Sequence, residues 1–278
     1  MPELSPLVPR LVWMACSLIA IAIGGTVYSQ SRINLVSDWR MALGNKSEKP
    51  QNGAFSLRSE WPMEAEEAER LLLEMARLQS DLTEMFPLPL NGRPIEGNLF
   101  ATKESYLAYV TKRFPEVADR PALYVHDAGV GRILLYAHSN TLDDLRHECT
   151  HAILHKMFPS IPLWLDEGLA EYFEVPRDRR VDENPYLVEL KELIQAGWQP
   201  NLLRLEQKLQ LTEFTGEDYR ESWAWTHFLL HGPQPVRQVF TEFLIESQSG
   251  GGISRLSEKL NSCFTQLETD LISHLKDW

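Results

Sequence analysis

The stretch LRHECTH, residues 145 to 151, contains two histidines four residues apart, with a glutamate directly after the first. On a helix, positions i and i+4 are neighbours one turn apart, so His147 and His151 can present imidazole nitrogens to one tetrahedral zinc ion. Glu148 lies beside them, where its carboxylate can take a proton as a water attacks a carbonyl and pass it to the leaving group. The spacing therefore predicts a zinc site with a general base; the alternative is an ordinary amphipathic helix.

A catalytic zinc needs a third protein ligand, and the next helical stretch offers acidic candidates. LWLDEGLAEYFE begins just after Pro162 and carries Asp166, Glu167 and Glu171. Glu167 could complete a set of two histidines and one carboxylate while leaving the fourth position open. Glu171, one turn later on the same face, is suited to accept the free N–H of a ligating imidazole.

Together, HECTH and WLDEGLAEYFE resemble the gluzincin metallopeptidases, and most closely small bacterial gluzincin-like domains. Those domains share the pattern His-Glu-x-Thr-His followed by Trp-Leu-x-Glu-Gly-Leu-Ala-Glu-Tyr. The resemblance covers roughly residues 54–245, and its strong motifs cover 145–175. It implies a zincin-like fold with the active-site helix between the sheet and the helical half.

The resemblance also implies a role for each residue that matches the motif. His147, His151 and Glu167 fall on the ligands of one Zn²⁺ ion, and Glu148 falls on the general base. Glu171 falls where the thermolysin-like branch keeps an acid four residues after its ligand.

A tyrosine in a later helix is the expected oxyanion donor. The aminopeptidase branch has this tyrosine in a Tyr-x-Lys-Gly setting, and DYRESWAWTHFLLH is similar in position and pattern, which places Tyr219 there. Glu221 and Ser222 stand where that branch has Lys and Gly. Without Tyr219, His227 is the next candidate. The sequence contains no Gly-x-Met-Glu-Asn motif, so no anchor for a substrate amino terminus is recognisable.

Composition narrows the class of partner. The chain of 278 residues has a net charge of −12 and no dense basic run, which argues against nucleic acid. The resemblance to metallopeptidases implies a peptide or protein as the substrate. Its three cysteines include no CxxC pair, and Cys149 is expected to be a small buried hydrophobe.

The N-terminal region predicts export or tethering. Residues 1–10 form a flank, and residues 11–28 are almost wholly apolar, as in a retained transmembrane anchor or a signal peptide. We favour the anchor, with the catalytic domain outside the cytoplasm, in the periplasm or extracellular space. Residues 29–53 have the composition of a linker, and residues 54–278 form the metallopeptidase domain.

The order of the predicted elements indicates an α+β fold, with a small mixed N-terminal sheet and its helices followed by a mainly helical half. Strands are expected in 54–61, 94–102, 121–129 and 131–139, and helices in 62–86, 103–114, 142–158, 163–174, 183–197, 216–231, 235–247 and 253–275. We expect the strand in GRILLYAHS, residues 131–139, to pair with an extended substrate.

The leading hypothesis is a membrane-tethered zinc metallopeptidase. A zinc hydrolase of a non-peptide amide or ester is an alternative, because zinc activates either kind of carbonyl. From another class, the alternative is an anchored interaction protein whose zinc is structural. Glu148 weighs against this last reading, because a structural site needs no base.

Overall fold

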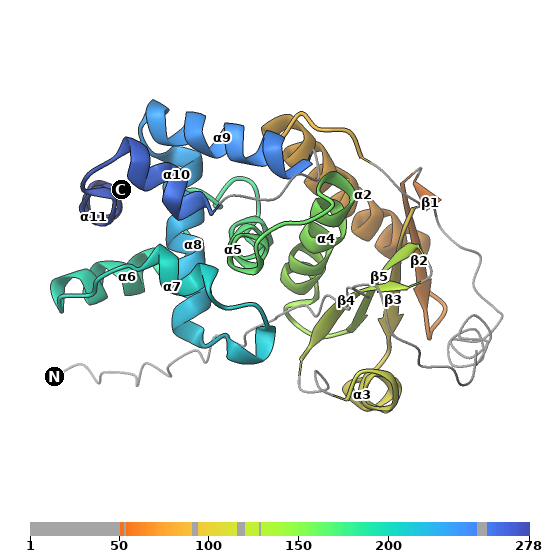
Figure 1. Cartoon of the computed structure of the whole chain (residues 1–278). Coiled ribbons are helices and arrows are strands. Elements are labelled where there is room, and N and C mark those ends of the chain that lie inside the picture. The colour runs from red at the N-terminus through yellow and green to blue at the C-terminus, as the bar shows by residue number, and fades with distance from the viewer. Residues whose placement is uncertain (1–50, 53, 91–93, 116–119, 128, 249–254) are drawn as a thin grey trace, which may run out of the picture.

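The structure is a computed structural model that describes residues 51–52, 54–90, 94–115, 120–127, 129–248 and 255–278. A mixed sheet with two helices comes first, and a helical remainder follows (Figure 1). The predicted α+β fold is therefore confirmed.

The sheet has five strands in the order β1-β2-β3-β5-β4. The strands are β1 (Gln51–Asn52), β2 (Phe55–Ser59), β3 (Ile95–Phe100), β4 (Ala122–Asp127) and β5 (Val130–Tyr136). The pairs β2–β3 and β3–β5 are parallel, whereas β1–β2 and β4–β5 are antiparallel. Strand β1 lies within the range predicted as linker.

The edge of the sheet nearest the helical half is β4, and this corrects one expectation. The GRILLYAHS strand is β5, which pairs with β3 on one side and with β4 on the other. Its backbone donors and acceptors are already used in two ladders, so pairing of β5 with a substrate is wrong. Among the described strands, β4 has a partner on one side only.

The helices cover the sheet and build the second half of the molecule. They are α2 (Ala65–Met85), α3 (Lys103–Arg113), α4 (Thr141–Met157), α5 (Leu163–Glu174), α6 (Pro185–Gln195), α7 (Leu202–Glu206), α8 (Gly216–His231), α9 (Gln234–Gln248), α10 (Leu256–Cys263) and α11 (Leu267–Asp277). The single helix expected over 253–275 is two helices, because the chain is extended at Phe264 (φ −130°, ψ 134°). The short helix α7 was not expected.

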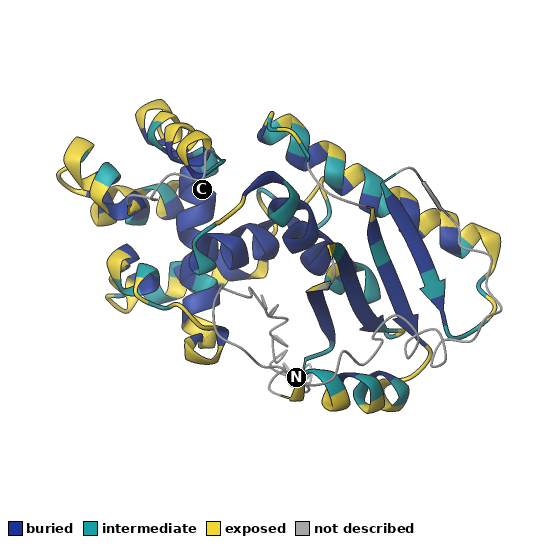
Figure 2. Ribbon diagram, turned by 45° about the vertical axis from the view of Figure 1, so that its right-hand side comes forward, coloured by how far each residue is buried: buried dark blue, intermediate teal, exposed yellow. Residues whose placement is uncertain are grey.

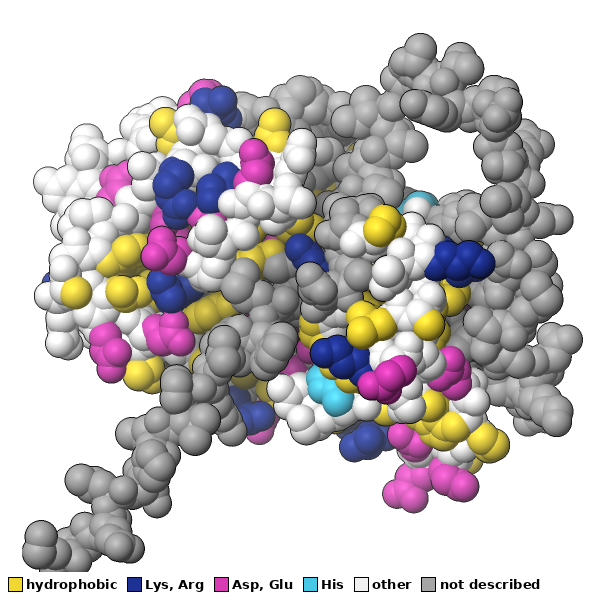
Figure 3. Space-filling model, turned by 90° about the horizontal axis from the view of Figure 1, so that it is seen from below, with side chains coloured by type: hydrophobic (Ala, Val, Ile, Leu, Met, Phe, Trp, Pro, Cys, Tyr) yellow, Lys and Arg dark blue, Asp and Glu magenta, His cyan; other side chains and the backbone are white. Residues whose placement is uncertain are grey.

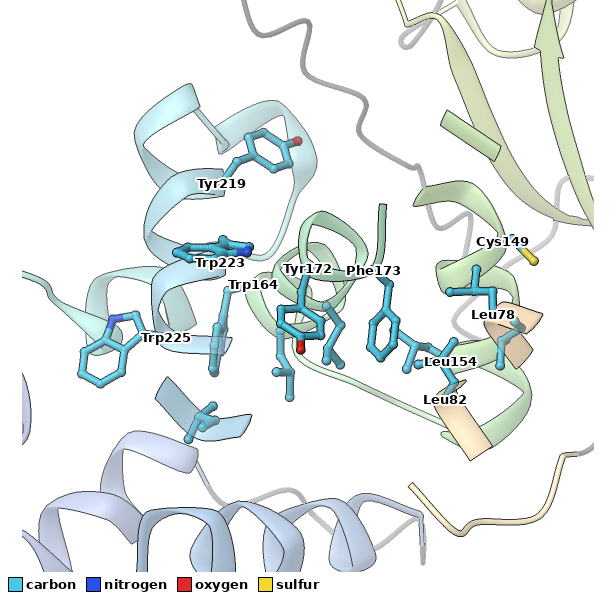
Figure 4. Packing of buried hydrophobic residues seen from close by; sticks show 14 of the residues in the cluster. Leu78, Leu82, Cys149, Leu154, Trp164, Tyr172, Phe173, Tyr219, Trp223 and Trp225 are labelled. Atoms are coloured by element: carbon cyan, nitrogen blue, oxygen red, sulfur yellow. The ribbon is translucent and has the colours of Figure 1, made fainter. Parts of the chain in front are cut away.

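Three helices, α4, α5 and α8, form the buried centre of the molecule (Figure 2). Aromatic side chains of α5 and α8 fill the space around them, among them Trp164, Tyr172 and Trp223 (Figure 4). Gly168 of α5 faces α8 so closely that a Cβ atom there would lie 2.5 Å from the Ser222 carbonyl oxygen. The glycine therefore lets α5 approach the backbone of α8.

The predicted membrane-anchored localisation is wrong for the described part of the chain, where no helix is both long and apolar enough to cross a bilayer. Residues 11–28, on which that expectation depended, lie outside the described residues. Membrane anchoring is therefore not supported by the described residues.

The face of the molecule seen from below carries both positive and negative side chains (Figure 3). In Figure 3, dark blue Lys and Arg side chains alternate with magenta Asp and Glu side chains. The coloured residues of this face show no continuous basic patch, in keeping with the acidic composition of the chain.

Candidate metal centre

Helices α4 and α5 bring the three predicted ligands together. Pro162 precedes α5 and ends the connection from α4, so that the two helices pack against each other. The Glu167 Oε2 atom lies 3.6 Å from His147 Nε2 and 3.7 Å from His151 Nε2. One ligand atom from each of the three residues lies within 4.8 Å of the others, and all three side chains are fully buried.

These positions fit a tetrahedral metal. Two ligand atoms each about 2.1 Å from one zinc ion lie about 3.4 Å apart, close to the observed separations. The Nε2 atoms of His147 and His151 and both carboxylate oxygens of Glu167 have no hydrogen-bond partner within the described structure. Buried polar atoms are normally satisfied. A cation between them would satisfy all three groups, so the residues present fit a bound zinc ion.

The surrounding charges also favour a cation. Burial alone would lower the pKa of His147, but the neighbouring carboxylates of Glu167 and Glu174 raise it well above its usual value. At His151, burial alone would also lower the pKa, but the charges of Asp166 and Glu167 raise it above its usual value. The pocket therefore stabilises positive charge, which a proton or a metal ion can supply.

The Nδ1 atom of each imidazole lies close to a carboxylate of α5. His147 Nδ1 lies 3.0 Å from Glu174 Oε2, and His151 Nδ1 lies 3.0 Å from Asp166 Oδ2. Asp166 Oδ2 also contacts His155 Nε2 at 3.1 Å. The hydrogen bond at His147 Nδ1 fixes the orientation of that ring and leaves its Nε2 atom free for a metal, whereas His151 Nδ1 has only the charge contact with Asp166.

Glu171, the predicted acceptor, lies in the same cluster. Together with His147 and Glu174 it forms a second group whose ligand atoms lie within 4.8 Å of one another. Its carboxylate accepts a hydrogen bond from Tyr186, and burial raises its pKa well above the usual value. The contact to the His147 Nδ1 atom at hydrogen-bond distance comes from Glu174. A direct role for Glu171 on a ligating imidazole stays a prediction.

Glu148 is fully buried on α4, between the two histidine ligands in sequence. Burial raises the pKa of Tyr106 on α3, and the negative charge of Glu148 raises it further. The same charge acts on Arg120, which lies just before β4. The base predicted from sequence therefore lies within electrostatic range of a tyrosine and an arginine from the sheet half of the molecule.

Tyr219 and His227 both lie on α8, but in different surroundings. Tyr219 is fully buried, and its hydroxyl has no hydrogen-bond partner among the described residues. Its ring projects from α8 with the hydroxyl directed toward the side on which α4 lies (Figure 4). The assignment as oxyanion donor stays a prediction.

His227 is not available as the alternative donor. Its Nδ1 atom lies 2.9 Å from His274 Nε2, and its Nε2 atom lies 3.2 Å from the Val181 carbonyl oxygen. Burial and two neighbouring histidines lower its pKa to about 3. Both ring nitrogens are therefore engaged with groups other than the candidate metal ligands.

Cys149 agrees with the expectation of a small buried hydrophobe. It is a free cysteine with no exposed area, and burial raises the pKa of its thiol. A thiol kept in the neutral form is a poor metal ligand. It belongs to neither group of candidate ligands found among the described residues.

Sequence reasoning named Asp166 only as a candidate third ligand, and it did not assign Glu174, Tyr106 or Arg120 to the site. Asp166 and Glu174 flank Glu167 by one and seven residues on α5, and a full helical projection could have identified them as neighbours of the histidines. Tyr106 and Arg120 reach the site only through the fold of the sheet half, and no local pattern marks them.

Comparisons with known proteins add no family to this picture. No protein-family model matches the chain, and no curated protein matches it.

Proposed function

We propose that this protein is a zinc-dependent peptidase of gluzincin type. The observation that carries the proposal is the convergence of His147 Nε2, His151 Nε2 and the Glu167 carboxylate, all buried and lacking hydrogen-bond partners within the described structure. Glu148 beside them distinguishes the cluster from a purely structural metal site, because a structural site requires no additional buried carboxylate next to its ligands.

The residues divide the work of hydrolysis as follows. His147, His151 and Glu167 would hold the zinc ion, which supplies Lewis-acid polarisation of the carbonyl and a lower pKa for an attacking water. Glu148 accepts the proton of that water and delivers it to the leaving nitrogen. Tyr219 donates its free hydroxyl proton as a hydrogen bond to the oxygen that gains charge. Glu174 and Asp166 keep the imidazole rings in place.

The strand β4 supplies a surface for an extended peptide. Its outer edge is unpaired among the described strands, and its Tyr124 packs edge-on against His155 of α4 at a ring distance of 5.2 Å. An extended substrate can therefore add to the sheet beside the helix that carries the ligands.

The proposal is tested by metal analysis together with a random peptide library. We expect about one zinc per chain, cleavage of library peptides detected by mass spectrometry, loss of cleavage with a chelator and recovery on adding zinc. Bound zinc with no cleavage of any peptide contradicts the peptidase assignment. Cleavage of simple esters or non-peptide amides alone would instead support the alternative hydrolase.

A further inference from the structure

Arg120 is a half-buried cation near the candidate active site that the mechanism above does not use. It lies two residues before Ala122, the first residue of β4. Its Nη1 atom is buried and has no hydrogen-bond partner among the described residues. Burial lowers the pKa of the guanidinium, and the charges of Glu167 and Glu148 oppose that effect. The guanidinium therefore lies near both a zinc ligand and the general base.

The Tyr106 hydroxyl is a second donor in the same place. Tyr106 is fully buried on α3, between Phe100 at a ring distance of 5.7 Å and Tyr136 at 5.5 Å. Its hydroxyl has no partner in the described structure and interacts electrostatically with Arg120 and Glu148. Burying an arginine nitrogen and a phenol without partners is costly. An anionic ligand can satisfy both the arginine nitrogen and the phenol, because each can donate a hydrogen bond and the arginine carries positive charge.

The direction of β4 indicates which part of a peptide reaches this position. Arg120 marks the N-terminal end of β4, near Glu148, whereas Tyr124 farther along the strand contacts His155 in the last turn of α4. A peptide added antiparallel to β4 has its N-terminal part along the strand and its C-terminal end at Arg120. In this orientation, the group that reaches the positively charged Arg120 is the C-terminal carboxylate.

We propose that Arg120, assisted by the Tyr106 hydroxyl, binds the free C-terminal carboxylate of the substrate and makes the protein a carboxypeptidase. This inference rests on the proposed function. The reaction is addition of water across the last peptide bond: the C–N bond breaks, the hydroxyl joins the carbonyl carbon, and the proton goes to the leaving amine. The products are one free amino acid and a peptide shorter by one residue.

The test uses one random peptide library prepared with free and with amidated C-termini, and the zinc-loaded full chain. We expect release of single C-terminal residues and a preference for free acids on the order of 100-fold, because charge-assisted bidentate hydrogen bonds are lost with the amide. Arg120→Gln should remove the preference by slowing cleavage of the acids only. Arg120→Lys should restore part of it, since lysine keeps the charge but loses the planar fork. Tyr106→Phe removes the hydroxyl with little change in side-chain volume, and it should weaken binding of the peptides with free C-termini.

Two controls separate this role from a structural one. Lys112→Gln removes an exposed charge of α3 and should leave the preference intact. Immobilised, zinc-loaded Glu148→Gln protein should retain free acids over amides, and the double variant with Arg120→Gln should retain both equally. This second readout does not depend on catalysis.

The outcomes distinguish the two proposals. Equal cleavage of acids and amides, or cleavage at internal bonds, overturns the carboxylate site and leaves the peptidase standing. No cleavage of either library overturns the proposed function itself. If Arg120→Gln does not fold, the proposal is tested by the unmodified chain alone, from its rate of cleavage of free acids divided by its rate for amides. A ratio near one contradicts the proposal.

Discussion

At the level of single residues, the candidate metal centre consists of two rings, each oriented by a carboxylate. Asp166 and Glu174 hold the Nδ1 atoms, and Glu167 between them in sequence faces both Nε2 atoms. One helix therefore supplies both the candidate third ligand and the carboxylates beside the two histidines. Although burial alone would raise it, His151 and His155 lower the pKa of Asp166 below its usual range. Asp166 consequently keeps its negative charge beside the two imidazoles.

A graded series of substitutions in α5 should separate these roles. Asp166→Asn and Glu174→Gln are each expected to weaken zinc binding by about 10- to 100-fold, because they disturb only the orientation of a ring. Glu167→Ala should abolish stoichiometric zinc. Affinity is measured by competition with a chromogenic chelator, and zinc content by elemental analysis.

Asp178→Asn provides the control for the series, since Asp178 is exposed and lies outside the cluster. It should bind zinc like the unmodified chain. An unchanged zinc content in Glu167→Ala would remove Glu167 from the ligand set, and equal losses in Asp178→Asn would point to a general charge effect instead.

At the level of elements, the site depends on how closely α5 approaches α8. The Glu-Gly pair of the motif has a physical explanation, because Gly168 allows the contact and Glu167 precedes it. A methyl group at 168 would lie 2.4 Å from Thr226 Oγ1 and 2.5 Å from the Ser222 carbonyl oxygen. The Ser222 carbonyl oxygen belongs to the backbone and cannot rotate away.

Gly168→Ala should therefore destabilise the protein by about 1–3 kcal/mol, the usual cost of overpacking, even though alanine is the better helix former. Chemical denaturation measures the effect. Adding Thr226→Ala should restore only part of the loss, because the Ser222 carbonyl remains. Increased stability of Gly168→Ala would contradict the close packing described for these helices.

Elements that depend on local sequence patterns could be predicted, whereas features that depend on contacts distant in sequence could not. The helices of HECTH and WLDEGLAEYFE and the strand β3 follow from local periodicity and were predicted. The placement of β4 at the edge was not, because strand order depends on contacts distant in sequence. The break at Phe264 was also missed, since Leu256, Leu260, Leu267 and Leu271 continue an apolar spacing across it.

The candidate site shows the same division. His147, Glu148, His151 and Glu167 lie within two local motifs, so their meeting could be predicted from helical spacing and one turn. Tyr106 and Arg120 come from the sheet half and meet the site only in the folded chain. Their polar atoms stand out because they are buried without partners in the described structure, a property that no sequence pattern carries.

At the level of the whole molecule, zinc should change how stability depends on pH. In the metal-free protein the pKa values of His147 and His151 are raised in the folded state. A raised pKa contributes stability below the unfolded value of about 6.5 that is lost as the pH rises through the folded pKa. Protons and zinc also compete for the same nitrogens, so zinc binds more tightly at higher pH.

The difference in melting temperature between zinc-loaded and chelated protein should therefore widen from about pH 6 to pH 8. Thermal unfolding monitored by circular dichroism at a series of pH values measures it. The variant His147→Ala should show a much smaller difference throughout. A difference that stays constant or narrows with rising pH would argue against zinc at the two histidines.

The central claim is that Glu148 acts as the base for peptide hydrolysis at a zinc site formed by His147, His151 and Glu167. The most direct measurement compares peptide cleavage by the unmodified chain and by Glu148→Gln, with zinc content matched by elemental analysis. We predict equal zinc in both and a rate of cleavage lower by at least about 100-fold in the variant, because glutamine cannot accept the proton of the attacking water. Undiminished cleavage by the zinc-loaded variant would contradict the account.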